Sequence, residues 1–440
     1  MPPTPRDADR PQELRFSRME RLLGGHPIST VSVDGTSARF VTDPALVRRI
    51  LVTDARHYGK SELLQKARIL SKSGLLAPDD ARHRHYRRLA HPHLRTTAVT
   101  AHTPLMEDVA RATAASWRPG QPVDIQAAMC RAAGRIALNA LLGPTSGQTS
   151  ALLTERLAAL SWEMITKPLY GNAARAQRPA HRLRQASTDF RTLLARCITD
   201  RLDPPGPTTH YLAALLADAG PAAGGALSGE QVCDEAVMML TAATVTTASV
   251  MSWALYTLAR HPLAEEKVLK DLAQPADTDT DTDTDTGIGT GARPGHGHGP
   301  PGYTLRFLME VLRLHPPVWI TSRRTLTPVT LGEHTLPAGT DVVFSSYLLH
   351  RHPAHYRDPH RFDPDRWLTT RPRPQDATYL PFGTGARGCV GETFAWQELH
   401  VLLGALAQEW RLTLHPGTRP RAAAHTTLHP HRLLMIPQPR

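Results

Sequence analysis

The sequence predicts a mainly α-helical protein that carries a smaller β-rich lobe. Apolar residues recur at helical spacing over most of residues 104–270, which indicates a series of amphipathic helices. Short strand-forming stretches occur at about 20–60 and 320–350, and both are expected to contribute to the lobe. The 440 residues exceed the ~250–300 at which a single hydrophobic core stops growing, so a minor lobe or a second domain is expected.

Local signals place the elements at both ends of the chain. Residues 28–53 indicate two strands around an Asp34-Gly35 turn, followed by a helix that opens near Asp43-Pro44. After a helix at 304–314, strands are expected around 331–349, and a final helix at about 391–409. The lobe therefore combines segments that are far apart in the sequence.

The longest predicted helix opens with a Ser228-x-x-Gln231 capping box and ends at Pro262. Its roughly 32 residues would span about 48 Å, enough to cross a domain. The stretch 274–302 contains an Asp-Thr repeat and many glycines and prolines, so we expect a disordered surface insertion there.

The composition excludes several classes of protein. The 41% apolar fraction is ordinary for a globular chain, no apolar run approaches a membrane span, and the first residues lack the apolar core of a signal peptide. We therefore expect a cytoplasmic protein without an anchor. The net charge of +11 comes from scattered arginines without aromatic interleaving, which argues against nucleic acid. A basic docking face for an acidic electron-transfer protein and a compositional bias without function both remain open.

One of the four cysteines stands out. None belongs to a CxxC pair, which argues against zinc and disulfides, and three fit as small core residues on helices. Cys389 instead lies among glycines at the start of the last helix, where free amides and the helix dipole favour a thiolate. The glycines at 383, 385, 388 and 391 let the backbone approach a flat group closely.

The segment Phe-Gly-Thr-Gly-Ala-Arg-Gly-Cys-Val-Gly resembles the haem-binding loop of the cytochromes P-450, Phe-x-x-Gly-x-Arg-x-Cys-x-Gly, at every fixed position. The resemblance extends over nearly the whole chain and implies one P-450 domain, residues 1–440, with a triangular α-rich haem domain and a small β-rich lobe. It implies that Cys389 is the axial thiolate of haem b, a ligand that favours O–O cleavage. The implied cofactor-binding loop residues are Phe382 beside the sulfur, Arg387 on a propionate, Gly383 and Gly391.

Three charged residues match the family's structural triad. Glu310 and Arg313 are three apart, so they share one helix face and can pair. Pro-Asp-Arg-Trp, containing Arg366, stands where the family has Pro-Glu-Arg-Phe. The resemblance implies a buried triad of Glu310, Arg313 and Arg366 that locks the haem-side loops, with a structural role.

Further basic residues are implied to contact the haem propionates. Arg323 stands ten residues after Arg313, with Arg324 as the neighbouring alternative. His83 and Arg87 form an i, i+4 pair, which without the resemblance would be two polar residues on a solvated helix face. The family's His-x-x-x-Arg signature implies that both face the cofactor.

The long helix departs from the family pattern at its centre. The implied oxygen-side residues are Ala243, Val245, Thr246 and Thr247, where members commonly have Gly, an acid and two threonines. In the family the acid and the alcohol relay protons for oxygen activation, and valine cannot relay a proton. Water held by Thr246 and Thr244, a hydroxyl of the substrate, or a different reaction would each account for the change.

The implied function is monooxygenation of a hydrophobic secondary metabolite, with a terpenoid held weakly over a polyketide or fatty acid. Electrons would come from NAD(P)H through a separate ferredoxin or flavodoxin with its reductase. A redox-neutral or peroxide-driven cyclisation or rearrangement is the alternative that Val245 suggests, and a non-catalytic haem protein is the third. The substrate pocket is expected from the stretches 60–76 and 161–170, the long helix and the stretch after Pro317, with candidates Leu75, Trp162, Met164, Val318 and Trp319. Each of these five side chains fits ordinary core packing equally well.

Overall fold

A computed structural model describes most of the chain. The described residues are 12–13, 16–33, 35–61, 63, 75, 80–143, 147–166, 177–199, 210–219, 227–274, 301–369, 372 and 377–440. The predicted insertion therefore lies almost entirely outside the described residues, and so does most of the predicted pocket stretch at 60–76.

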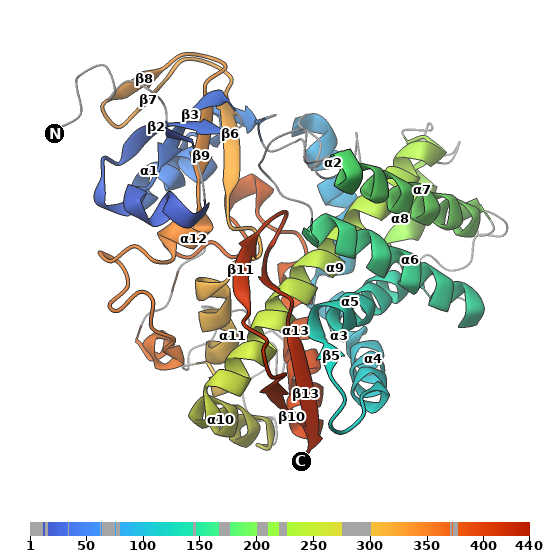
Figure 1. Ribbon diagram of the computed structural model, residues 1–440. Helices are drawn as coiled ribbons and strands as arrows, with labels where there is room; N and C mark the ends of the chain where they lie inside the picture. Colours follow the sequence, from blue (N-terminus) through green and yellow to red (C-terminus); the bar gives the residue numbers. More distant parts are fainter. Residues whose placement is uncertain are drawn as a thin grey trace.

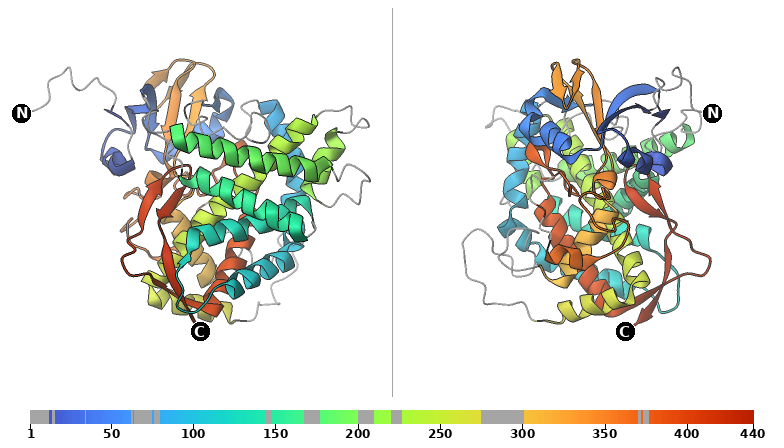
Figure 2. Two further views of the ribbon diagram at one scale, coloured as in Figure 1. Left: turned by 45° about the vertical axis from the view of Figure 1, so that its right-hand side comes forward. Right: turned by 90° about the vertical axis from the view of Figure 1, so that its left-hand side faces the viewer.

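The helices form a thick layer beside a sheet at one corner of the molecule (Figure 1). Helix α9 crosses the middle of this layer and packs against α13 (Figure 1). Figure 2 shows the same fold from two further sides. The helices are α1 Pro44–Arg48, α2 Asp80–Ala90, α3 Thr96–Thr100, α4 Thr103–Ser116, α5 Ile125–Leu142, α6 Gly147–Thr166, α7 Gln177–Thr199, α8 Tyr211–Ala219, α9 Gly229–Arg260, α10 Pro262–Leu272, α11 Tyr303–Leu314, α12 Ser346–Leu349 and α13 Glu392–Glu409.

The main sheet has the strand order β1-β2-β3-β9-β6-β4. It joins the two segments expected to share a lobe, because β3 pairs in parallel with β9 through Arg39 opposite Val342. A separate sheet near the C-terminus has the order β10-β13-β5. The strands are β1 Gln12–Glu13, β2 Ile28–Val33, β3 Thr36–Val41, β4 Tyr58–Lys60, β5 Val123–Asp124, β6 Thr321–Thr325, β7 Val329–Leu331, β8 His334–Leu336, β9 Asp341–Phe344, β10 Trp410–Leu414, β11 Arg421–Ala424, β12 Leu428–His431 and β13 Leu434–Pro439.

The long helix forms as the sequence predicts. Helix α9 has 32 residues and the full capping box, in which the Ser228 side chain accepts from Gln231 N and the Gln231 side chain accepts from Ser228 N. Most of its residues are buried. It is long and apolar enough to cross a membrane, but 78% of its most apolar window is buried inside the protein, as in a core helix.

One short element differs from the expectation. The strand-like stretch 331–349 ends in a helix, α12, which begins when the Ser345 hydroxyl accepts from Leu348 N. The Ser345 side chain also donates to the Trp319 carbonyl at 2.6 Å. A serine that caps a helix competes locally with strand pairing, so four residues leave the sheet.

Asp271 fastens the two sides of the predicted insertion together. Its carboxylate oxygens accept hydrogen bonds from Tyr303 N and Thr304 N, each at 2.9 Å. These are free donors at the start of α11, so Asp271 near the end of α10 caps the next helix across the gap in the described chain.

Candidate active site

The loop before α13 holds Cys389 by backbone hydrogen bonds. Cys389 N donates to the Phe382 carbonyl at 2.8 Å, and Gly388 N donates to the Gly385 carbonyl at 3.0 Å. The Cys389 side chain is exposed, whereas the other three cysteines are buried, as the sequence predicts. The loop is therefore folded tightly while its one thiol stays accessible.

Two glycines of this loop adopt left-handed backbone conformations. Gly383 has φ +69° and Gly385 has φ +73°. A Cβ on Gly385 would overlap the Leu51 carbonyl oxygen, whereas the nearest atom to a Cβ on Gly383 would be 3.9 Å away. Both positions favour glycine for the backbone angle, and Gly385 also requires it for close packing against the N-terminal lobe. At Gly391 a Cβ would lie 4.0 Å from the Cys389 sulfur.

Helix α2 lies against the cysteine loop. The Arg87 guanidinium donates to the Gly388 carbonyl at 2.7 Å, which joins residues 301 positions apart. His83, one turn earlier, is 5% exposed. The pair is therefore turned inward and is not on a solvated face, and Arg87 places its guanidinium against the loop.

The two neighbouring arginines of β6 have different partners. Arg324 makes a two-pronged contact with Asp341, at 2.9 Å and 2.7 Å. Asp341 is 4% exposed and also accepts from the Ser61 hydroxyl at 2.6 Å. Arg323 is partly buried and donates to the Ser322 carbonyl. Because Arg324 serves a buried carboxylate, Arg323 is the better candidate for a bound anion.

The predicted charge triad is assembled and fully buried at its centre. Glu310 and Arg313 are both 0% exposed, and Arg313 donates to the two Glu310 carboxylate oxygens at 2.9 Å and 2.8 Å. Arg366 donates to Glu310 at 3.0 Å. Arg313 also binds the carbonyls of His350 and Pro359, so the network ties α11 to the irregular segment before the cysteine loop.

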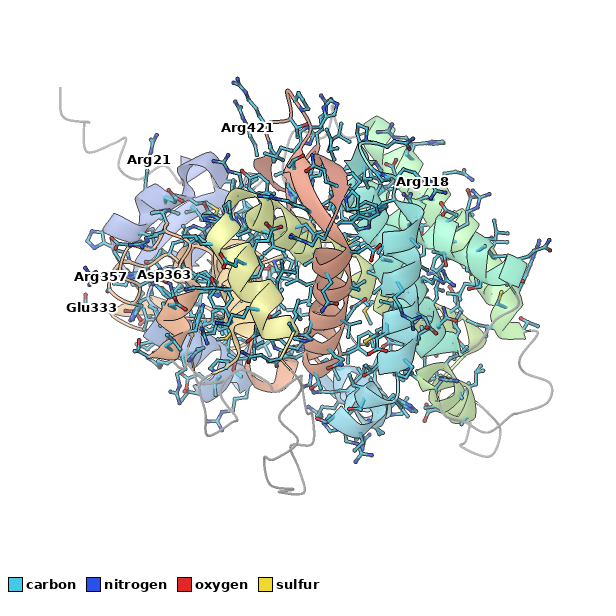
Figure 3. The ribbon with its side chains drawn as sticks, turned by 90° about the horizontal axis from the view of Figure 1, so that it is seen from below. Arg21, Arg118, Glu333, Arg357, Asp363 and Arg421 are labelled. Atoms are coloured by element: carbon cyan, nitrogen blue, oxygen red, sulfur yellow. The ribbon has the colours of Figure 1, made fainter. Side chains whose placement is uncertain are left out.

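Sequence reasoning missed a fourth member of this network. The Trp367 indole donates to Glu310 at 3.1 Å, where a phenylalanine could not. The signal was the tryptophan directly after Arg366. Asp363 N also donates to Glu310, and Arg366 binds the Arg357 carbonyl; Figure 3 labels Asp363 and Arg357 on this segment.

One stripe of α9 opens out of the core. Met239, Ala242, Ala243 and Thr246 are at least partly exposed, while the residues between them are buried. This i, i+3, i+4, i+7 spacing puts them on one helix face. The Thr246 hydroxyl donates to the Ala242 carbonyl at 2.8 Å. Ala243 and Val390, the neighbour of Cys389, border the same core cluster.

Two of the predicted oxygen-side residues do not share this open face. Val245 is 4% exposed and lies in the main core cluster. Thr247 is also 4% exposed, and its hydroxyl donates to Glu398 of α13 at 2.9 Å. The open face therefore contains Thr246 and Ala243, while Val245 is a packing residue and Thr247 connects two helices.

Glu398 is a buried acid that sequence reasoning also missed. It is 2% exposed, and burial raises the pKa of its carboxyl to about 8 against the smaller lowering effect of the Thr247 hydrogen bond. At neutral pH the carboxyl therefore favours its protonated form. A glutamate on a helix nine residues after Cys389 matches no motif considered in the sequence analysis. Its burial is visible only in the packed structure.

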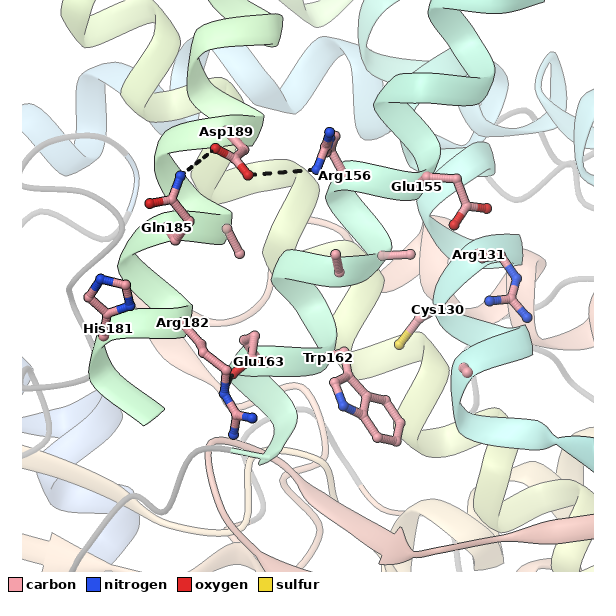
Figure 4. Close-up of a pocket in the computed structure, with 14 residues that line it drawn as sticks. Cys130, Arg131, Glu155, Arg156, Trp162, Glu163, His181, Arg182, Gln185 and Asp189 are labelled. Carbon is pink, nitrogen blue, oxygen red and sulfur yellow. Dashed lines mark hydrogen bonds and ion pairs between the residues drawn. The ribbon is translucent and has the colours of Figure 1, made fainter. Parts of the chain in front are cut away.

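The predicted pocket residues separate into different environments. Val318 is 47% exposed, and Trp319 is 1% exposed, with its indole donating to the His425 carbonyl. Met164 packs against the core, and Leu75 N donates to the buried Glu235. Trp162 lines a different cavity of about 550 Å³ between α5, α6 and α7, together with Cys130 and Arg131 (Figure 4).

These residues fit a haem-thiolate centre. The site residues are an accessible thiol, a stripe of mostly small or apolar side chains on α9, and basic groups on α2 and β6. The stripe suits a flat apolar ring system, and the cations suit its carboxylates. His83, Arg87, Arg323 and Arg387 are the candidates for these carboxylates.

Comparison with known proteins decides the family. The family model described as Cytochrome P450 matches residues 9–440. The chain is a cytochrome P450. It is therefore a haem-thiolate monooxygenase that needs redox partners to supply electrons from NAD(P)H.

Two proteins similar to this cytochrome P450 come from Streptomyces species. It is 31% identical to cyclooctatin synthase of Streptomyces melanosporofaciens over 404 residues, which cover 90% of this chain and 85% of the relative. It is 30% identical to pentalenene oxygenase of Streptomyces avermitilis over 427 residues, which cover 94% of this chain and 91% of the relative.

Solved structures show the same fold. The retinoic acid-bound cyanobacterial CYP120A1 matches with a TM-score of 0.79 at 20% identity, covering 97% of this chain and 95% of that one. A six-coordinated cytochrome P450 from Thermus thermophilus matches with a TM-score of 0.70 at 25% identity, covering 96% and 99%. The expected α-rich fold with small sheets is thus confirmed.

Proposed function

We propose that this cytochrome P450 hydroxylates a terpenoid, using O2 and electrons from a separate ferredoxin or flavodoxin. The observation that carries the proposal is the similarity, over about nine tenths of the chain, to relatives named for cyclooctatin and pentalenene. A cytoplasmic setting fits this function. Cys389 is the proposed axial ligand, and bound haem supplies the activation of oxygen.

The apolar surfaces near the site support a hydrophobic substrate. Ala242 and Ala243 form the open part of α9, and Val318 is exposed just before β6. The Val318 segment is attached to α9, because Leu428 N donates to Pro317 and the Leu428 carbonyl accepts from Trp253 of α9. A terpenoid would bury this apolar surface, and few polar groups would be needed to hold it.

Exposed arginines support an acidic electron donor. Arg84 and Arg88 are exposed on α2, on either side of Arg87, whose guanidinium contacts the cysteine loop. Positive charge at this place steers an acidic ferredoxin or flavodoxin toward Cys389. The Arg84→Glu/Arg88→Glu double variant should lower the rate of reduction by ferredoxin, most strongly at low ionic strength. An unchanged rate would remove this docking face.

The substrate class is tested by spectroscopy and product analysis. Terpenes, fatty acids and polyketides are titrated into the ferric protein, and the spin-state change gives Kd for each. We expect terpenes to bind best and to give a hydroxylated product with O2, ferredoxin and reductase. Val318→Phe should weaken terpene binding, whereas Leu326→Phe, at another exposed apolar residue, should not. Preferential binding of another class would refute the terpenoid proposal.

The alternative that the sequence left open, a redox-neutral or peroxide-driven reaction without the reductase, is tested in the same assay. The same substrates are therefore incubated with hydrogen peroxide alone and with no oxidant. Product formed without electrons would favour this second function. Product that depends on ferredoxin and O2 would favour monooxygenation.

The ligand assignment needs its own variant. Cys389→Ala should abolish the red-shifted carbon monoxide band of the reduced thiolate form. Cys197→Ala, at a buried cysteine of α7, should keep it. A thiolate-type band in Cys389→Ala would overturn the assignment.

A further inference from the structure

Two neighbouring acids near the start of α9 are buried in different ways. Asp234 is 8% exposed and forms an ion pair with Arg191 of α7. Glu235 is 0% exposed, and in the described part of the chain its two hydrogen-bond partners are neutral. Its Oε2 accepts from Leu75 N at 2.7 Å, and its Oε1 accepts from the Tyr211 hydroxyl at 2.9 Å. A carboxyl buried against neutral donors costs more than an apolar side chain of similar size, which makes Glu235 a candidate for function.

The position of Glu235 relates it to the open stripe of α9, which begins at Met239. Glu235 stands four residues before Met239 and seven before Ala242, so it lies on the same face of the helix. The stripe is at least partly exposed, whereas Glu235 is fully buried. The open face therefore closes one turn before Met239, at the point where Leu75 N contacts the carboxyl.

The contact places Leu75 beside the rest of the site. The Leu75 side chain is partly buried and packs against the core cluster that Ala243 and Val390, the neighbour of Cys389, also border. A backbone N–H taken out of water needs an acceptor, so the Glu235 carboxyl decides where this backbone can settle.

Tyr211 fixes the carboxyl itself. It is 4% exposed at the start of α8, a helix that packs against α9, and its hydroxyl occupies the second carboxyl oxygen of Glu235. With one oxygen held from α8, the other points to Leu75 N in a single direction. Glu235 thus joins α8, α9 and Leu75 at the closed end of the stripe.

We propose that Glu235 is a positioning residue for substrate specificity, which fixes Leu75 as the end wall of the space over the open stripe of α9. Thr246, at the other end of the stripe, is eleven residues beyond Glu235, or about 16 Å along the helix axis. The inference rests on the proposed function and refines it. Compact polycyclic terpenoids should bind better than open-chain ones, because an extended chain would have to displace Leu75.

Azoles that bind the haem iron through a ring nitrogen measure this space without any terpenoid. Imidazole, phenylimidazole and biphenylylimidazole form a series of increasing length, and titration of the ferric full chain gives Kd for each. The wild type should bind the biphenylyl probe more weakly than the phenyl probe. This ratio of Kd values should fall several-fold in Glu235→Leu and in Leu75→Ala, while Kd for imidazole stays at the wild-type value. An unchanged ratio in Glu235→Leu would overturn the proposal.

Further variants separate the contact with Leu75 from the mere burial of an acid. Glu235→Gln keeps an oxygen that can accept from Leu75 N, so it should retain most of the wild-type ratio. Tyr211→Phe removes the other hydrogen bond only, and it should retain the ratio as well. The double variant Glu235→Leu/Leu75→Ala should resemble Leu75→Ala, because Glu235 acts through Leu75. Additive effects of the two substitutions would contradict the positioning role.

Hydrogen exchange of the haem-loaded full chain tests the anchor of Leu75 directly. The peptide that contains Leu75 should exchange several-fold faster in Glu235→Leu, because its N–H loses the acceptor. Tyr211→Phe should keep the wild-type exchange rate. If Glu235→Leu exchanged at the wild-type rate too, the carboxyl would not hold Leu75.

These measurements separate the inference from the proposed function. If terpenes fail to bind while the azole series responds to Glu235→Leu as expected, the terpenoid proposal fails and the end wall stands. If terpenes are hydroxylated while the azole ratio ignores Glu235→Leu, the end wall fails alone. Open-chain terpenes that bind better than polycyclic ones to the wild type would also refute it.

Discussion

At the scale of single residues, Gly385 and Gly383 make a matched pair. Both have positive φ, but only at Gly385 would a Cβ overlap another backbone atom, the Leu51 carbonyl oxygen. We expect Gly383→Ala to cost about 1 kcal/mol, the usual strain of a left-handed alanine. Gly385→Ala should cost clearly more and should lower the haem content of the purified protein.

Thermal unfolding and the haem-to-protein ratio measure the difference. Both variants add one methyl group at a glycine with positive φ, so the cost of the backbone angle is similar in the two. The difference between them reports the contact with Leu51. Equal losses would mean that the loop does not need its close contact with Leu51.

Val245→Glu should destabilise the protein, although it introduces the acid that the family resemblance leads one to expect at this position. Val245 is 4% exposed and packs in the main hydrophobic core. A carboxyl there would be buried without a partner, at a cost of about 3 kcal/mol or more. Val245→Thr is the control, because its hydroxyl could bond back within the helix as its neighbours do. Chemical unfolding of both variants measures the costs, and an undiminished stability of Val245→Glu would contradict this interpretation.

Some site residues could be predicted from the sequence and others could not. The Glu310, Arg313 and Arg366 side chains meet as the spacing predicts, whereas the roles of the cysteine-loop residues stay predictions. From the sequence, Trp162 and Trp319 fit either a substrate pocket or ordinary core; in the structure Trp162 lines the cavity between α5, α6 and α7, and Trp319 is core. Side-chain direction depends on how helices pack, and the sequence alone does not contain that information. The burial of Glu398 could not be predicted from the sequence for the same reason.

At the scale of elements, the contact between α9 and α13 should make stability depend on pH. Burial raises the pKa of Glu398 to about 8 from an ordinary 4.5. Between these values the folded protein holds a proton that the unfolded chain has released. The contribution of Glu398 to stability is therefore fully present at low pH and is lost as the pH rises toward 8. The free energy of unfolding should fall by at most about 1.4 kcal/mol per pH unit for this group.

Glu398→Gln should remove this slope, which chemical unfolding at pH 5, 6, 7 and 8 would detect. Glu235→Gln on α9 is the comparison, because burial raises the pKa of Glu235 as well, to about 7. Its removal should lower the slope mainly between pH 5 and 7, where Glu398→Gln should lower it too. If Glu398→Gln kept the wild-type slope over that interval, Glu398 would be ionised in the folded protein.

Elements with a complete local signal were predictable. Helix α9 has a capping box, helical apolar spacing and a proline after its end, and its 32 residues match the expectation. Helix α12 has four residues in a strand-forming stretch, and its start depends on Ser345 beside Trp319. A tertiary contact decides such a short element, so periodicity cannot reveal it.

At the scale of the whole molecule, the segment between α10 and α11 should be dispensable. Asp271 caps α11 from the end of α10, so the two helices are joined without it. Replacing residues 277–299 by a short Gly-Ser linker should keep the haem content and change the free energy of unfolding by no more than about 1 kcal/mol.

Asp271→Ala provides the contrast. Loss of its two hydrogen bonds to α11 should cost about 0.5–2 kcal/mol, as for other helix caps. Haem content and thermal unfolding of both proteins give the comparison. A deletion that lost haem while Asp271→Ala kept it would assign the segment a role in the fold.

The packing of Gly385 on Leu51, together with the pairing of β3 with β9, also sets an order of events on the ribosome. Leu51 and Gly385 are about 330 residues apart, which at roughly 5–20 residues per second separates their synthesis by roughly 15–70 s. During that time β3 lacks its parallel neighbour and presents an open edge, which invites pairing with other nascent chains. We therefore expect haem capture to be among the last steps of biosynthesis, and slower translation or added chaperones to raise the yield of loaded protein.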